Sequence, residues 1–204
     1  MTITARKQRE KLEMRRIILD AAKGIFLEKG FYSASIRNIA EKIEYSPGTI
    51  YLYYKDKDDI FHALHEEGFG KMLGMMQPLQ HVSDPMERLI AMGKVYMEFA
   101  LQNKELYDLM FIMEAPINAE HNREKWEMGG RTLDLLKKVL AECQKKGYFK
   151  GLNIEYLSFM IWSSLHGMCA LFCRRRCQVY EHKEETELLQ NGMTYFTDLL
   201  TKKR

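Results

Sequence analysis

The stretch IEYSPGTIYLYYKDKDD, residues 43–59, holds a Ser-Pro-Gly-Thr sequence, then three tyrosines in four positions, then a mixed run of Lys and Asp. Ser46 is a good N-cap, and Pro47 fits the first helical position because its missing N–H has no intrahelical partner there. We therefore expect a short helix from Pro47 to about Tyr54. Asp56 is expected to cap a further helix, whose early acidic residues suit its positive end.

The residues before this stretch predict two more helices. The first spans about Ala5 to Lys29 and ends at Gly30, a residue typical of the position just past a helix C-terminus. A short helix runs from Ser35, its N-cap, to about Ile43. Two short helices joined by a tight break form a helix-turn-helix, and the longer first helix is expected to pack behind them.

The rest of the 204-residue chain shows helical periodicity, with only four prolines and little material for strands. Periodic segments lie at about 84–103, 104–114, 120–146, 154–175 and 183–202. We predict an all-α protein with two domains. Residues 1–55 form a helix-turn-helix head, and residues 56–204 form a larger helical domain.

Charge is distributed unevenly along the chain. Residues 1–55 hold 11 Lys or Arg and 6 Asp or Glu, whereas the remainder holds 20 and 22. A basic N-terminal quarter on a near-neutral body indicates a polyanionic partner. The polar, basic N-terminus lacks an apolar leader, and the four cysteines form no secreted disulfide framework, so we expect a cytoplasmic protein.

If the helix after Ser46 is a DNA-recognition helix, its first turn would enter the major groove. Gly48 allows close approach, and Thr49 can meet a base edge or a thymine methyl group. Phosphate contacts are expected from Tyr51, Tyr53, Lys55 and Lys57. Arg37, on the preceding short helix, could reach a guanine or the backbone.

Residues 30–61, GFYSASIRNIAEKIEYSPGTIYLYYKDKDDIF, resemble the DNA-binding domain of the TetR family of transcriptional regulators. The matching positions are Ser35, Ile39-Ala40, Ser46-Pro47-Gly48-Thr49, Tyr51, Tyr54 and Lys57. The resemblance implies an all-helical homodimer whose heads grip successive major grooves of a pseudo-palindromic operator. It also implies that Tyr54 packs inward. Leu52 departs from the polar or larger aromatic residue of many relatives, which leaves an apolar base contact there. The DNA-binding candidates are Ser35, Arg37, Ser46, Pro47, Gly48, Thr49, Tyr51, Leu52, Tyr53, Lys55 and Lys57.

Further along, IWSSLHGMCALF (residues 161–172) resembles the Trp-His-Gly signature of one TetR subgroup's C-terminal domain, and NKELYDLMF resembles another stretch of that subgroup. Both imply a ligand-sensing, dimerising body without naming a ligand. Residues 156–173 carry no formal charge, which favours a helix buried in a subunit interface over a membrane span. With the last helix (Leu189, Met193, Phe196, Leu200) it would form a four-helix bundle between subunits.

The ligand pocket is expected among methionines and aromatic residues, which suit a broad apolar site but equally suit an ordinary core. His166 is either a polar anchor for a ligand or a hydrogen-bonded structural histidine. The pocket candidates are Met72, Met92, Tyr96, Phe99, Phe111, Trp126, Phe159, Trp162 and His166. No cofactor and no metal site is expected.

The sequence therefore favours a transcriptional regulator, a repressor released by a small apolar or amphipathic effector. A second reading makes Cys169, Cys173 and Cys177 a redox sensor, since they share a helix face beside three arginines that would favour thiolates. A third reading, a helical enzyme or small-molecule carrier without DNA binding, finds no nucleophile–base pair, phosphate loop or paired carboxylates to support it.

Overall fold

The computed structural model describes residues 3–114, 127–180 and 184–201, and these residues are arranged in helices and connecting turns without a strand. The chain forms two compact units. The N-terminal unit comprises Met1–Gly68 with Glu105–Lys125, and the C-terminal unit comprises Phe69–Lys104 with Trp126–Arg204. The division falls inside the fourth helix, whereas the sequence placed it at residue 55, in the turn before that helix.

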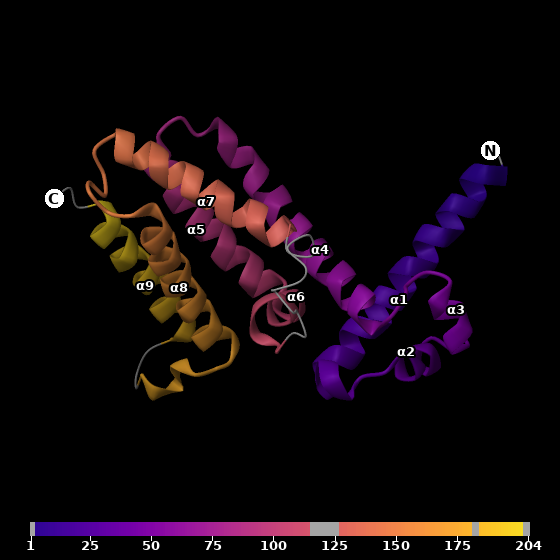
Figure 1. Cartoon of the computed structure of the whole chain (residues 1–204). Helices are drawn as coiled ribbons and strands as arrows, with labels where there is room; N and C mark the ends of the chain where they lie inside the picture. Colours follow the sequence, from indigo (N-terminus) through magenta and orange to yellow (C-terminus); the bar gives the residue numbers. More distant parts are fainter. Residues whose placement is uncertain (1–2, 115–126, 181–183, 202–204) are drawn as a thin grey trace. The chain divides into compact units, whose positions relative to one another are not determined.

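The N-terminal unit begins with α1 (Ile3–Ser33), α2 (Ile36–Lys42) and α3 (Pro47–Tyr51), followed by α4 (Lys57–Met76) as far as Gly68 (Figure 1). The starts of α2, α3 and α4 lie where local chemistry predicts them, whereas α1 continues past Gly30 to Ser33 and α3 ends at Tyr51 instead of Tyr54. Gly30 interrupts α1 with a φ of 75°, a conformation that a glycine adopts without strain. Ser35 forms a capping box with Asn38, and Ser46 accepts the Thr49 N–H. Asp56 likewise accepts the Asp59 N–H at the start of α4.

The core of this unit explains why α4 belongs to it. Phe26, Phe31 and Phe61 pack with ring centroids 4.9–5.5 Å apart. Around them lie aliphatic and small side chains from α1 to α4, namely Ile18, Ala21, Ala22, Ile25, Ile39, Ala40, Ile50, Ile60 and Leu64. The first turns of α4 thus complete the head, and a domain boundary at residue 55 would cut through this core.

A later segment returns to the same core. α6 (Lys104–Tyr107) leads into η2 (Asp108–Ile112), a short π-helical turn closed by a Met113 N–H to Asp108 carbonyl bond of 2.7 Å. Leu109 is fully buried in the head core. The buried ring of His65 lies 2.8 Å from the Leu109 carbonyl oxygen. A Cβ at Gly68 would lie 2.3 Å from Met110 Sδ, so α4 and η2 are in close contact here.

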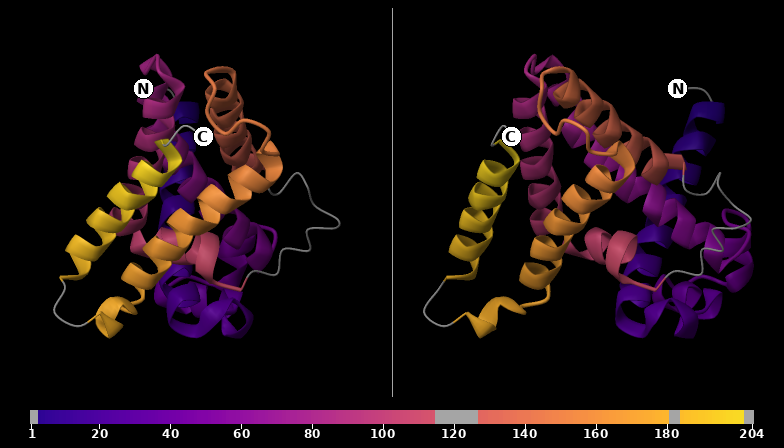
Figure 2. Two further views of the ribbon diagram at one scale, coloured as in Figure 1. Left: turned by 90° about the vertical axis from the view of Figure 1, so that its left-hand side faces the viewer. Right: turned by 60° about the vertical axis from the view of Figure 1, so that its left-hand side comes forward.

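Within its described residues, the C-terminal unit contains the end of α4 and six further elements. These are η1 (Gln77–His81), α5 (Pro85–Gln102), α7 (Glu127–Lys145), α8 (Ile154–Cys173), η4 (Cys177–Val179) and α9 (Glu185–Thr201). α5, α7 and α8 pack against one another, and α9 lies along α8, as both views in Figure 2 show. α8 has the length and composition of a membrane-spanning helix, but a helix packed within a helical unit has the same properties.

Candidate functional sites

The exposed edge of α3 is the candidate DNA-reading surface. Ile50 points into the core, while Pro47 and Gly48 are exposed and Thr49 is half-buried. The Thr49 hydroxyl lies 3.1 Å from Ser46 Oγ, so the cap also orients the side chain expected to read a base. The exposed fractions of Tyr51 and Leu52 are 56% and 76%. α3 thus presents most of its first turn to solvent, together with Tyr51 at its end and the apolar Leu52 that follows it.

The tyrosines after α3 divide between core and surface. Tyr54 is 2% exposed, Tyr53 is half-buried and Tyr51 is exposed. Burial raises the pKa of the Tyr54 hydroxyl. Arg15 connects α1 to the segment that follows α3. Its guanidinium lies 4.4 Å from the Tyr54 ring centroid and donates to the Tyr53 carbonyl oxygen at 3.1 Å. The sequence did not single out Arg15, since its partners lie 38 residues away.

Lys57 is placed differently from the expected phosphate contact. Its ammonium donates to the carbonyl oxygens of Phe31 (2.7 Å), Ala34 (2.9 Å) and Tyr32 (3.4 Å), and it lies 4.3 Å from the centre of the Phe31 ring. An ammonium has three N–H donors, so these carbonyls use all of them. Lys57 therefore ties α4 to the end of α1.

The other DNA-binding candidates lie on the surface of the head. Arg37 on α2 and Lys55 in the turn before α4 are exposed. Ser35 is exposed as well, but its hydroxyl is engaged by Asn38, so its observed role is to cap α2. Arg37 and Lys55 are consequently the cations of this set that are available to a phosphate backbone.

In the C-terminal unit, three of the pocket candidates form a hydrogen-bonded cluster. The Tyr96 hydroxyl lies 3.1 Å from His166 Nδ1, and Trp162 Nε1 donates to the same hydroxyl at 3.4 Å. Burial lowers the pKa of His166 and favours its neutral ring. The cluster links α5 to α8, which is the arrangement expected of a structural histidine.

A cavity of about 500 Å³ lies elsewhere in this unit, where the end of α4 and η1 meet α5 and α7. Its walls are largely apolar, with two amides and two cations. The lining residues are Leu73, Gly74, Met76, Gln77, Leu79, Gln80, Arg88, Met92, Leu135, Lys138 and Val139. This volume is in the usual range for a small-molecule site.

The two cations of this cavity differ in how they are held. Arg88 donates from Nε to the Val82 carbonyl oxygen (2.9 Å) and from Nη1 to Glu142 Oε2 (2.8 Å), so its guanidinium is fixed. Lys138 is exposed. An apolar chamber with cations at its wall suits an amphipathic anion, with its chain inside and its charged end toward the lysine.

Of the eight pocket candidates that lie within the described residues, Met92 alone lines this cavity. Met72 and Phe99 are buried in the C-terminal unit, and Phe111 lies in η2 of the N-terminal unit. Trp126 lies outside the described residues. Phe159 is 66% exposed, which corrects its assignment to a pocket: it lies on the outer face of α8. The cavity was not predicted because no sequence pattern marks the convergence of three separate helices.

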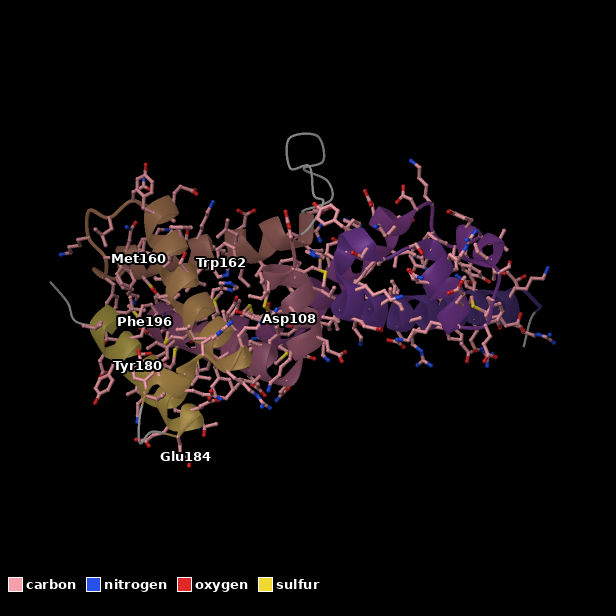
Figure 3. All side chains as sticks on the ribbon, turned by 90° about the horizontal axis from the view of Figure 1, so that it is seen from below. Asp108, Met160, Trp162, Tyr180, Glu184 and Phe196 are labelled. Atoms are coloured by element: carbon pink, nitrogen blue, oxygen red, sulfur yellow. The ribbon has the colours of Figure 1, made fainter. Side chains whose placement is uncertain are left out.

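The outer face of α8 and α9 is rich in large exposed apolar side chains. Figure 3 labels Met160 and Trp162 on α8 and Phe196 on α9. The exposed members of this face are Tyr156, Phe159, Met160, Trp162, Leu171, Tyr195 and Leu199. α8 is therefore not buried on all sides within one chain. An exposed apolar face of this kind is typical of a protein–protein interface.

The cysteines do not have the environment expected of redox sensors. Cys169 is fully buried, and burial raises the pKa of its thiol to about 12. Burial also raises the pKa of the Cys177 thiol. Cys173 donates to the Ala100 carbonyl oxygen at 3.7 Å. Because reactive cysteines have lowered pKa values, these raised values favour a packing role.

Two curated relatives resemble much of the chain. The "Fatty acid metabolism regulator protein" of Bacillus subtilis is 25% identical over 150 residues, which cover 72% of this chain and 77% of that protein. The "HTH-type transcriptional regulator HbdR" of Aromatoleum sp. is 26% identical over 155 residues, covering 76% and 68%. These relatives are named as regulators, not as enzymes.

Solved structures share the fold. The transcriptional regulator FadR from Bacillus subtilis, in complex with stearoyl-CoA, superposes with a TM-score of 0.73 at 21% identity, covering 91% of this chain and 97% of that one. A TetR-family regulator from Syntrophomonas wolfei gives a TM-score of 0.75 at 23% identity, with coverages of 96% and 97%.

Two family profiles match the sequence itself. Residues 18–64 match the profile described as "Bacterial regulatory proteins, tetR family", and residues 89–193 match the one described as "Tetracyclin repressor-like, C-terminal domain". The first match covers the helices of the head and the start of α4, and the second covers the body from α5 into α9. The chain belongs to the TetR family of bacterial transcriptional regulators.

Proposed function

We propose that this DNA-binding regulator is a cytoplasmic repressor that leaves its operator when a long-chain fatty acyl ligand, such as an acyl-CoA, enters the C-terminal unit. The observation that carries the ligand class is the cavity of about 500 Å³, apolar along its walls and bordered by Arg88 and Lys138. An acyl chain matches the apolar walls, and a negatively charged phosphate group matches the cations. A relative named for fatty acid metabolism and a neighbour that binds stearoyl-CoA support the same class.

On the DNA side, the first turn of α3 reads bases while Arg37, Lys55 and Tyr51 contact phosphates. Gly48 and Thr49 carry the reading surface, because they stand at the exposed start of the helix. Two heads are needed to read an inverted repeat, and the exposed apolar face of α8 and α9 is the proposed dimer interface.

Release would follow from differential affinity. An effector that fits the cavity better in one arrangement of the heads lowers the population of the arrangement that matches the operator. The effector does not need to touch the head. The coupling is set by the ratio of its affinities for the two states.

The test begins with an operator obtained by selection from a random duplex library. Fluorescence anisotropy then follows the labelled operator while stearoyl-CoA, or free CoA as a control, is added. We expect stearoyl-CoA to release the DNA and free CoA to have no effect. Operator binding that stays unchanged at saturating stearoyl-CoA would contradict the ligand class while leaving the DNA-binding assignment intact.

Two variants locate the effector site. Leu135→Trp fills the cavity from a half-buried position and should abolish release without weakening operator binding. Lys138→Gln removes an exposed cation from the wall and should raise the concentration for half-release about 3- to 5-fold, corresponding to the loss of one exposed charge contact. Lys145→Gln is the matched control, since Lys145 lies on the same helix but does not line the cavity. Equal release by all three proteins would place the effector elsewhere.

A further inference from the structure

We propose that the first turns of α1 form a basic arm that binds the DNA phosphates flanking the bases read by α3. This inference rests on the proposed DNA-binding function and adds a second contact surface to it. The arm is defined as residues 4–13, together with Arg15 at its base. It lies outside the segment that matches the TetR head, which begins at residue 18.

The arm extends beyond the core of its own unit. Residues 4–13 are all exposed, and the first side chains that pack against the core are Met14 and Ile18. In Figure 1 these turns of α1 project past α2 and α3. Most helices in proteins are stabilised by packing of an apolar face, and about ten residues without such packing are marginally stable on their own. The extension therefore has no role in the packing of the head.

Charge gives the arm a preferred partner. Residues 1–16 hold six Lys or Arg and two Asp or Glu. The first turn of α1 contains no acidic residue to balance its positive end. Of the two acids, Glu10 is paired with Arg6 at 2.8 Å. This excess of positive charge disfavours the isolated helix, and a polyanion would relieve it.

The cations are also ordered on the helix. Lys7, Lys11 and Arg15 are spaced four residues apart, which places them along one face of α1. Each step of four residues advances about 6 Å along the helix axis. A phosphate backbone, with a charge about every 3.4 Å of axis on each strand, can meet such a row with several contacts.

The row of Lys7, Lys11 and Arg15 ends next to the segment that follows α3. Arg15 Nη1 donates to the carbonyl oxygen of Tyr53, two residues beyond the end of α3, and the guanidinium lies over the Tyr54 ring. Both elements belong to the N-terminal unit. A duplex held by α3 would therefore continue along Lys11 and Lys7, and the arm would lengthen the footprint without reading further bases.

An anionic membrane is the other polyanion to consider, and the composition of the arm disfavours it. Helices that lie on membranes need a broad apolar face in addition to basic residues. Residues 4–13 contain one large apolar side chain, Leu12, which is 62% exposed. Attraction to phosphates without an apolar face fits nucleic acid better.

The experiment compares Lys7→Gln/Lys11→Gln with the unchanged full-length chain. Glutamine keeps helix propensity and removes two charges. Anisotropy titrations use the selected operator in two forms, trimmed to the read bases or extended by about one helical turn (roughly 10 base pairs) on each side, over a range of salt concentrations. On the extended duplex we expect the Kd of the double variant to rise on the order of 10-fold. The salt slope should fall by about four, because a dimer has two arms and loses two phosphate contacts from each. On the trimmed duplex the difference should vanish.

Two controls separate the arm from the head. Lys145→Gln/Lys146→Gln removes the same charge from exposed positions of the C-terminal unit and should leave Kd unchanged. Thr49→Ala should relax base preference on both duplexes. If Thr49→Ala does so while Lys7→Gln/Lys11→Gln binds the extended duplex like the unchanged chain, the arm inference fails and DNA reading stands. If the unchanged chain binds no duplex, both fail. Binding to vesicles of phosphatidylcholine and phosphatidylglycerol that requires Lys7 and Lys11, without an effect on DNA, would overturn the proposal in favour of a membrane.

Discussion

The N-terminal and C-terminal units differ in how completely one chain finishes them. In the head, Ser35, Ser46 and Asp56 close the starts of the short helices and of α4, and the aromatic core is buried almost entirely. The C-terminal unit instead keeps a cavity of about 500 Å³ and an outer face with seven exposed large apolar side chains. The head is therefore complete within one chain, whereas the C-terminal unit would be completed by the ligand and the second chain that we propose for it.

The most direct test of this difference is to introduce charged residues into the exposed apolar face of α8 and α9. Phe159→Glu/Tyr195→Glu should give a monomer, because two buried, unpaired carboxylates in each half of the interface are strongly unfavourable. Operator affinity should then fall about 100-fold or more, since the second head no longer binds as part of the same molecule. Sedimentation velocity reports the monomer, and anisotropy reports the affinity.

Leu152→Glu is the matched control for the interface, because Leu152 is exposed but lies in the turn before α8. It should remain dimeric and bind the operator normally. A double variant that still sediments as a dimer would show that the subunits meet through another surface.

A second test asks whether the head core truly includes η2. Burial lowers the pKa of His65 to about 4, whereas in the unfolded chain it titrates near its ordinary 6.5. Between those values the unfolded state binds a proton that the folded state does not. The contribution to stability is therefore full above about pH 6.5 and declines as pH falls, by up to about 3 kcal/mol near pH 4.

The measurement is chemical denaturation from pH 7.5 to 4.5 for the unchanged chain and for His65→Gln. Glutamine can donate to the Leu109 carbonyl oxygen but does not titrate. The variant should lose less stability on acidification, because other groups titrate equally in both proteins. Parallel pH profiles would mean that His65 is solvated in solution and that η2 is not held against α4.

A third and smaller effect distinguishes Lys57 from Lys55, both of which are expected from the sequence to contact phosphates. Lys57→Ala should lower the free energy of unfolding by about 1–3 kcal/mol, because the carbonyls of Phe31 and Ala34, in part-buried hydrogen bonds, and the exposed carbonyl of Tyr32 lose their charged donor. Lys55→Ala should leave stability within about 0.5 kcal/mol. Lys55→Ala should instead weaken binding to all duplexes and reduce the salt slope by about two, one phosphate contact for each head of the dimer.

The two lysines are compared by thermal unfolding and by salt-dependent DNA titrations. The opposite outcome, a stable Lys57→Ala with a reduced salt slope, would restore Lys57 as a phosphate contact. It would also mean that the end of α1 needs no tie to α4.

Local chemistry made the head largely predictable. Ser46, Pro47 and Gly30 act on neighbouring residues, so their positions in the sequence set the start of α3 and the interruption of α1. The ties of Arg15 and Lys57 were not predictable, because their partners lie 38 and 23 to 26 residues away. In the body, apolar residues occupy every face of α8, so periodicity could not separate buried Ile161 from exposed Phe159. The cavity depends on how helix ends converge, which no single segment encodes.

The close approach of Gly68 to Met110 reverses a general rule of helix design. Exchanging glycine for alanine in the middle of a helix ordinarily stabilises it by about 1 kcal/mol. At position 68 the added methyl would lie 2.3 Å from Met110 Sδ and 2.9 Å from its Cγ, so Met110 would have to move away from α4. Gly68→Ala would then weaken the packing of residues 108–112 against α4, although helix propensity alone predicts that this substitution stabilises the protein.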